Sequence, residues 1–146
     1  MKTFVSRVWL PLSAAMIVAF CAFATYSGSA AAAEVNVTLA GDHEVPPVKT
    51  MGSGSGTITI GADMAVSGSI TTKGVPGTAA HIHEGAAGKN GPVIIPLTKS
   101  GEDTWSVPAA AKLTEAQYKA FEAGDLYVNV HTKAHPGGEV RAQLKP

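Results

Sequence analysis

The sequence has a single cysteine, Cys21, close to the beginning of a chain of 146 residues. It therefore cannot form a disulfide within itself, and it offers no set of thiolates for a metal. It also lacks an excess of charge of one sign, because 11 basic residues face 11 acidic ones. A surface without excess positive charge has no electrostatic footprint for nucleic acid or for an anionic membrane. We expect neither of these as a binding partner.

Residues 1–33 have the pattern of a secretory signal peptide. Two basic residues precede an apolar run over residues 8–23, and small residues follow at 27–33. A positive start, an apolar centre and an Ala-x-Ala-like site predict export with cleavage within residues 30–33, and we favour cleavage after Ala33. A retained membrane anchor is the competing interpretation, because the apolar run is near the lower length limit for a span. The small-residue tail argues against it.

The mature chain predicted by this cleavage, residues 34–146, is long enough for one domain with a single core. It loses Lys2 and Arg7, so nine basic residues face 11 acidic ones and the net charge becomes −2. It also loses Cys21, so stability has to come from core packing or a bound metal. We expect a periplasmic or secreted protein without membrane contact after cleavage.

Apolar and polar residues alternate with a period of two along most of the mature chain, which indicates β-strands. Val35, Val37 and Leu39 mark the first strand. The glycines of residues 52–56 predict an irregular or bulged approach to the second strand. The later strands are predicted at residues 57–60, 65–71, 80–83, 93–97, 105–107, 126–132 and 139–144.

One helix interrupts the strands. Thr114 is a good N-cap with Gln117 three positions later, which is the pattern of a capping box, and Gly124 can end the helix. Tyr118 and Phe121 fall on one face of this helix. Short strands separated by turns, with one short crossover helix, predict an all-β fold: an immunoglobulin-like or Greek-key β-sandwich or barrel.

Four of the five histidines occupy two short stretches, His81 with His83 and His131 with His135. Residues two apart on a strand point to the same face, so His81 and His83 are expected to point away from the core. His131 shares that outer face if strand 126–132 lies alongside. Because imidazole is the commonest protein ligand for transition metals, we predict a metal site of these three histidines with His135 as a fourth ligand.

The predicted ligands suit Cu(II) or Zn(II), and the affinity order favours copper over zinc. His43 is a further candidate for the fourth position. Asn129 and Glu139 are expected to hold the ring N–H groups, and Arg141 is a candidate for steering anions. In the alternative interpretation each histidine is an ordinary surface or turn residue. The protein is then a non-catalytic module that recognises a protein partner.

The remaining motifs predict no independent catalysis. Gly85-x-x-Gly88-x-x-Gly91 is followed by no helix and no Lys-Ser/Thr pair, so it is interpreted as a β-connection rather than a phosphate-binding loop. No serine, base and orienting acid are recognisable as a set. We therefore predict that the protein is not an enzyme, with dismutase-like redox chemistry at the metal as the alternative.

Several motifs follow one another in order along the mature chain. They are Glu44-Val45-Pro46-Pro47-Val48, His81-Ile82-His83, Asn90-Gly91-Pro92-Val93, and the closing stretches 127–132 and 136–141. Together they resemble the CHRD domain, named after chordin, over essentially the whole mature chain. The resemblance implies an immunoglobulin-like β-sandwich or barrel in a secreted protein, and the family has no settled enzymatic activity. His43 and His135 depart from the family pattern, and both departures add an imidazole.

The strand with His81 and His83 is also similar to the copper-binding His-x-His strand of copper/zinc superoxide dismutase, another Greek-key β-barrel. By this resemblance His131 would be a third copper ligand from a distant strand. The similarity stops at loop 84–92, which contains neither a bridging histidine nor the zinc ligands of those enzymes. We therefore do not expect a dismutase with a zinc site.

Overall fold

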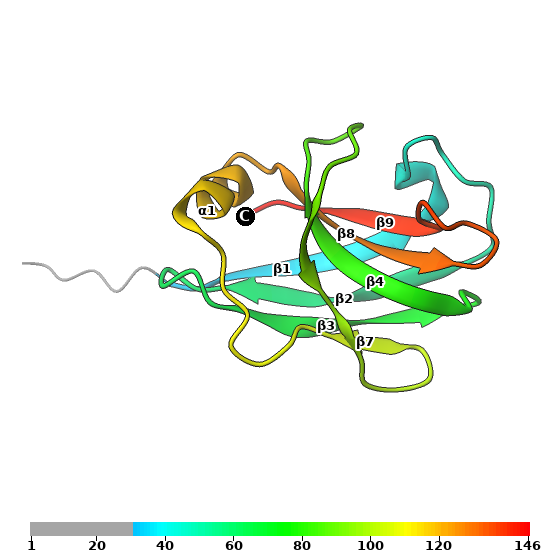
Figure 1. Ribbon diagram of the computed structural model, residues 1–146, viewed down its shortest axis with the longest axis horizontal. Coiled ribbons are helices and arrows are strands. Elements are labelled where there is room, and N and C mark those ends of the chain that lie inside the picture. The colour runs from blue at the N-terminus through cyan, green and yellow to red at the C-terminus, as the bar shows by residue number, and fades with distance from the viewer. Residues whose placement is uncertain (1–30) are drawn as a thin grey trace, which may run out of the picture.

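The structure is a computed structural model that describes residues 31–146, in which nine strands are accompanied by two short helices (Figure 1). The predicted signal peptide falls almost entirely on residues 1–30, which lie outside the described residues. The elements are β1 (Ala33–Ala40), the 3-10 helix η1 (Gly41–His43), β2 (Ser53–Ile60), β3 (Val66–Lys73), β4 (Gly77–Glu84), β5 (Val93–Pro96), β6 (Thr98–Lys99), β7 (Thr104–Ser106), α1 (Glu115–Glu122), β8 (Leu126–Thr132) and β9 (Val140–Leu144).

The strands form one sheet in the order β5-β4-β8-β9-β1-β2-β3-β7-β6. The two edge strands, β5 and β6, are consecutive in the chain and are joined through Leu97. The Leu97 N–H donates to the Ala80 carbonyl of β4 at 2.9 Å. The chain itself thus bridges the two edges, and the sheet curls into a nearly closed barrel. The expected all-β fold is confirmed, with every strand pair in the described part antiparallel.

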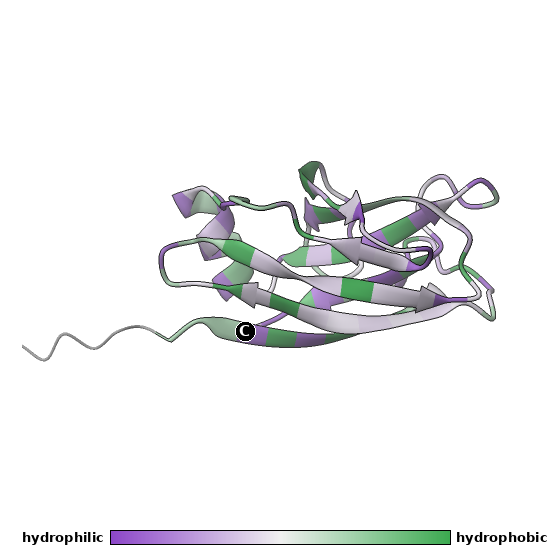
Figure 2. Cartoon of the chain, turned by 90° about the horizontal axis from the view of Figure 1, so that it is seen from below, coloured by the Kyte–Doolittle hydropathy of each residue, from purple (hydrophilic) through white to green (hydrophobic). Residues whose placement is uncertain are grey.

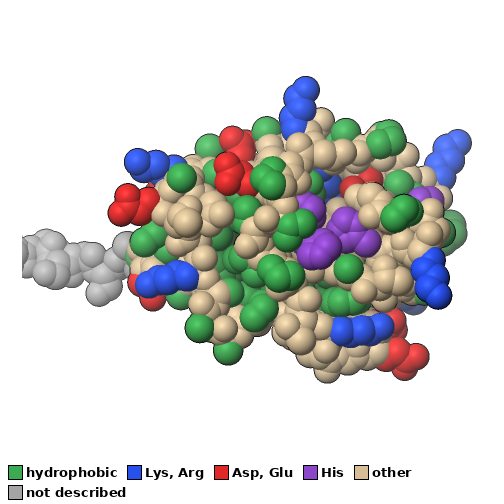
Figure 3. Space-filling view, viewed as in Figure 1, with side chains coloured by type: hydrophobic (Ala, Val, Ile, Leu, Met, Phe, Trp, Pro, Cys, Tyr) green, Lys and Arg blue, Asp and Glu red, His purple; other side chains and the backbone are tan. Residues whose placement is uncertain are grey.

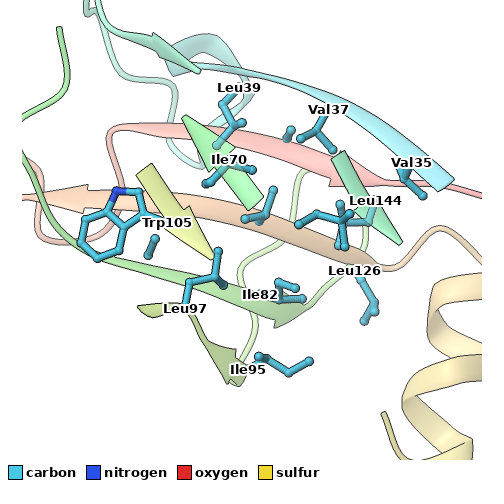
Figure 4. Close-up of a cluster of buried hydrophobic side chains, with 14 of the residues drawn as sticks. Val35, Val37, Leu39, Ile70, Ile82, Ile95, Leu97, Trp105, Leu126 and Leu144 are labelled. Carbon is cyan, nitrogen blue, oxygen red and sulfur yellow. The ribbon is translucent and has the colours of Figure 1, made fainter. Parts of the chain in front are cut away.

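The interior of the barrel is a single hydrophobic core. Val35, Val37 and Leu39 of β1 are buried as predicted, whereas the residues between them are exposed. Hydrophobic and hydrophilic residues alternate along the strands in Figure 2. Figure 4 shows side chains such as Ile82 and Trp105 meeting in this interior from different strands. Removing this apolar surface from water is the main stabilising contribution to the fold.

The glycine-rich stretch before Thr57 is a regular strand and not a bulge, so that prediction is wrong. β2 begins at Ser53 and pairs with β1 and β3 without a shift of register. A Cβ atom at Gly56 would collide with the carbonyl oxygen of Ser69 on β3. The glycine is explained by this close approach of two backbones, which a regular strand can also require.

Helix α1 is the predicted crossover helix, since it connects β7 to β8, which are not neighbours in the sheet. It lies at one end of the barrel in Figure 1. The capping box is confirmed: Thr114 Oγ1 accepts from the Gln117 backbone N–H at 3.2 Å, and Gln117 Oε1 accepts from the Thr114 N–H at 2.9 Å. Phe121 anchors the helix on the core. Within residues 31–146 no helix has the length and apolar character of a membrane span.

Candidate metal centre

The two histidine-bearing strands, β4 and β8, are neighbours in the barrel wall. Their antiparallel register places His83 opposite Tyr127 and His81 opposite Asn129. His131 follows Asn129 by two residues and therefore shares the outer face of the wall. The predicted convergence of three imidazoles outside the core is confirmed.

These three residues, His81, His83 and His131, form what we call the histidine cluster. One ring nitrogen of each lies within 4.8 Å of the others, and His81 Nδ1 is 2.9 Å from His131 Nε2. His83 is only 7% exposed, whereas His81 and His131 are half-buried. Figure 3 shows histidine atoms gathered on this face of the molecule. The cluster therefore has a buried side formed by His83 and a side that solvent reaches.

Two backbone carbonyls determine which nitrogen is free on His83 and His131. The Gly91 carbonyl lies 2.9 Å from His83 Nδ1, and the Pro136 carbonyl lies 2.9 Å from His131 Nδ1. A carbonyl can only accept a hydrogen bond, so both Nδ1 atoms carry the proton and both Nε2 atoms keep a lone pair. The backbone thus presets the tautomer in which Nε2 is available as a ligand.

The Nε2 atom of His83 is the most telling atom of the cluster, because it is buried and has no hydrogen-bond partner. A buried polar atom without a partner is uncommon in folded proteins, since its desolvation costs free energy that nothing offsets. Coordination of a metal ion would supply the partner that this lone pair lacks.

His81 differs from the other two histidines, because the nitrogen that it turns toward the cluster is Nδ1 and not Nε2. Because His131 Nε2 carries a lone pair, the 2.9 Å contact is a hydrogen bond donated by His81 Nδ1–H. If this proton moves to Nε2 of the same ring, Nδ1 becomes a third ligand atom beside the two Nε2 atoms. The cluster can therefore offer three nitrogen lone pairs while all three rings stay neutral.

Burial favours the neutral form of the His81 and His83 rings. It lowers the pKa of His81, and the neighbouring His131 and His83 lower it further. Burial also lowers the pKa of His83, against the opposing effect of the hydrogen bond to Gly91. Both rings therefore stay neutral to a lower pH than an ordinary histidine, and neutral imidazole is the form that binds metal.

A stack of side chains orients the His83 ring. The Tyr127 ring lies parallel to it, with 4.7 Å between centroids and 5° between planes. Arg141 Cζ lies 3.4 Å from the centroid of the Tyr127 ring. The guanidinium donates to the carbonyls of Ala86 and Lys89 at 3.3 and 2.9 Å. Arg141 therefore lies near the cluster, as predicted, but it is buried against Tyr127 and supports the stack. Its charge acts on His83 through this stack, and its guanidinium is not exposed to meet an anion directly.

Of the two residues expected to hold ring N–H groups, Glu139 does not do so. The Glu139 carboxylate accepts from the hydroxyls of Thr50 and Thr132, each at 2.7 Å. Asn129 Oδ1 is buried without a hydrogen-bond partner, and Asn129 Nδ2 faces Glu44 Oε1 at 3.5 Å. The predicted role is wrong for Glu139, whose carboxylate is taken up by the two hydroxyls. Asn129 does lie beside His83, where its side chain acts to raise the pKa of that ring. The carbonyls of Gly91 and Pro136 face the Nδ1 atoms.

Glu44 is a buried carboxyl group that the period of two does not reveal. Burial raises its pKa from 4.5 to about 6, although the cation of Arg141 acts in the opposite direction. The residue also lines a cavity of about 620 Å³ beside β1 and β9. A Cβ atom at Gly138 would collide with Glu44 Oε1, so the turn before β9 packs directly on this carboxyl. Its place within the Glu-Val-Pro-Pro motif is the signal that marks it in the sequence.

Neither predicted fourth ligand joins the histidine cluster. His135 belongs to the turn between β8 and β9, where its N–H donates to Thr132 Oγ1 and its carbonyl accepts from the Gly138 N–H, both at 3.1 Å. His43 Nδ1 donates to the Arg141 carbonyl at 3.1 Å. In the described part of the chain, no further histidine, cysteine, aspartate or glutamate lies with the three. Three of the four predicted ligands therefore lie together, whereas His135 lies outside the cluster.

Comparison with known proteins gives one match. Residues 35–144 match the CHRD domain, a range that contains the whole histidine cluster, Glu44 and Arg141. No curated protein and no solved structure gives a match.

Proposed function

This chain belongs to the CHRD domain family, and we propose that it is an extracellular module that binds one copper ion through His81, His83 and His131. The observation that carries this proposal is the lone pair of His83 Nε2. This atom is buried, has no hydrogen-bond partner and belongs to a group of three imidazoles. The carbonyls of Gly91 and Pro136 support it, because they hold two of the rings in the ligating tautomer.

The affinity order of divalent metals supports copper rather than zinc. Three imidazoles suit either ion, and Cu(II) binds a given set of nitrogen ligands more tightly than Zn(II). The 2.9 Å contact between His81 Nδ1 and His131 Nε2 is a hydrogen bond of the metal-free rings, so a bound ion would replace the shared proton.

The exposure of the cluster supports a role in storing or delivering the ion in the periplasm or outside the cell. Two of the three ligating rings are half-buried and reach the molecular surface (Figure 3). An ion held there can be exchanged without opening the barrel. CHRD domains occur in extracellular proteins, and export through a cleaved signal peptide would bring this chain to the same compartment.

The test is an equilibrium titration of the full chain, purified without a histidine tag, with Cu(II), Cu(I) and Zn(II). We expect one tight equivalent of Cu(II) and weaker binding of Zn(II). His83→Ala and His131→Ala should each reduce the Cu(II) affinity by at least about tenfold, because each removes a ligand. His135→Ala is the matched control, since it removes a nearby imidazole that lies outside the cluster.

Weak uptake without a fixed stoichiometry, insensitive to the cluster variants, would contradict the proposal. An equal loss of affinity in His135→Ala would contradict the three-histidine ligand set. In the first case the search for function would move to protein partners of the module.

A further inference from the structure

We propose that a Cu(II) ion in the histidine cluster keeps a coordination position on its solvent side, and that a small exogenous anion occupies this position. The inference rests on the proposed copper site and adds to it the chemical class of a second ligand. It follows from the protein donors that are in reach, from the exposure of the rings and from the charge around them.

The donors in reach leave the coordination of Cu(II) incomplete. The cluster supplies three nitrogens, and Cu(II) commonly takes four or more ligands in a tetragonal arrangement. Within residues 31–146 no other histidine, cysteine or carboxylate lies with the cluster. Among the buried side chains of residues 31–146, Asn129 Oδ1 is the other acceptor without a hydrogen-bond partner. Asn129 lies beside His83, on the buried side of the cluster and away from the solvent side. A position toward the half-buried rings of His81 and His131 stays open to solvent.

The charges around the cluster favour an anion over a neutral ligand. Three neutral imidazoles leave the double positive charge of the ion uncompensated. The two buried carboxylates on this side of the barrel are engaged elsewhere: Glu139 with the hydroxyls of Thr50 and Thr132, and Glu44 with Asn129. The cation of Arg141 is placed against Tyr127, whose ring stacks on His83. An anion at the open position therefore meets net positive charge.

The experiment titrates the Cu(II)-loaded full chain with sodium azide in a chloride-free buffer, followed by visible absorption and electron paramagnetic resonance. Azide is the probe because its coordination to Cu(II) gives a charge-transfer absorption and alters the resonance spectrum. We expect both changes to saturate with one azide per copper. Nitrogen couplings from histidine should persist at saturation. His135→Ala should give the same azide affinity within about twofold.

Three outcomes would overturn the inference, and they are distinguishable from one another. A copper signal with histidine couplings that azide leaves unchanged would show that protein groups fill the coordination sphere, while the copper site itself stands. An azide response present only in His135→Ala would identify His135 as the occupant of that position. Failure to load one copper would overturn the proposed function together with this inference.

Discussion

The inner and outer faces of β4 and β8 are built from alternating residues of the same strands, yet they have opposite characters. Ile82, Val128 and Val130 point inward and are almost fully buried in an apolar core. The residues between them carry imidazole, phenol and amide groups, and loops partly cover them. Core packing on the inner face can thus offset the free-energy cost of clustering partly buried polar side chains on the outer face, because each strand contributes to both faces.

The two faces differ in what determines their geometry. The inner face needs apolar residues of suitable volume at every second position, which is a local property of the strand. The outer face needs backbone groups from distant loops, such as the carbonyls of Gly91 and Pro136. Substitutions on the inner face should therefore change stability, whereas substitutions on the outer face should change metal binding.

The largest effect on stability is expected for Ile82→Ala, on the inner face between the two histidines of β4. Ile82 is 1% exposed, and truncation of such a side chain costs about 2–5 kcal/mol through lost burial and a residual cavity. Urea unfolding of the apo-protein measures this loss. The comparison variant is His131→Ala, for which we expect less than about 1 kcal/mol because its ring is half-buried. Equal losses in the two variants would contradict the division between the faces.

Copper should stabilise the folded protein by an amount that depends on the outer face alone. A ligand that binds only the folded state at 100 times its Kd adds about 2.7 kcal/mol to the free energy of unfolding. We expect the corresponding rise in Tm in the unsubstituted protein and its loss in His81→Ala. Differential scanning calorimetry with Cu(II) and with EDTA makes the comparison. A full copper-dependent rise in His81→Ala would remove that residue from the site.

Glu44→Gln should change how stability depends on pH. The folded-state pKa of Glu44, about 6, lies above its ordinary value of 4.5. The contribution of Glu44 to the free energy of unfolding is therefore fully present below pH 4.5 and is lost as the pH rises through about 6. His81 and His83 act in the opposite sense, because their lowered pKa values remove stability as the pH falls below 6.5.

The Gln variant removes only the Glu44 contribution. We expect its free energy of unfolding, relative to the unsubstituted protein, to rise by up to about 2 kcal/mol between pH 4.5 and 7. Urea unfolding with EDTA at several pH values measures the two curves. Parallel curves across this range would show that the Glu44 carboxyl titrates normally in the folded protein.

The smallest effect is expected for Tyr127→Phe, which keeps the ring stacked on His83 and removes only the hydroxyl. That hydroxyl accepts a hydrogen bond from the Gly91 N–H at 3.2 Å, so its loss should cost about 1 kcal/mol of stability. Copper affinity should change less than threefold, because the stack and the carbonyl contact to His83 remain. A large loss of copper affinity would mean that the hydroxyl, and not the ring, positions the ligand.

The features that depend on alternation along a strand could be predicted from the sequence. The all-β fold, the inward direction of Ile82 and the shared face of His81 and His83 follow from a period of two. The capping box around Thr114 was also predicted correctly, since it depends on residues only three positions apart.

The features that the sequence did not predict depend on loops. Loop conformation has no periodicity, so nothing indicated that Gly91 and Pro136 would present their carbonyls to the histidine rings. For the same reason the sequence predicts His135 as a ligand. In the structure the His135 backbone closes the turn, and the carbonyl of its neighbour Pro136 contacts the His131 ring. The burial of Glu44 likewise depends on residues distant in the sequence, since its carboxyl faces Asn129 and the turn at Gly138 packs on it.

The measurement that tests the central claim most directly is X-ray absorption spectroscopy of the copper-loaded full chain at one equivalent, combined with the same spectrum of His83→Ala. The account predicts scattering from three imidazoles at about 2.0 Å from the copper and the loss of one of them in the variant. A spectrum with fewer than three imidazoles, or one unchanged by His83→Ala, would contradict a copper site built from the histidine cluster.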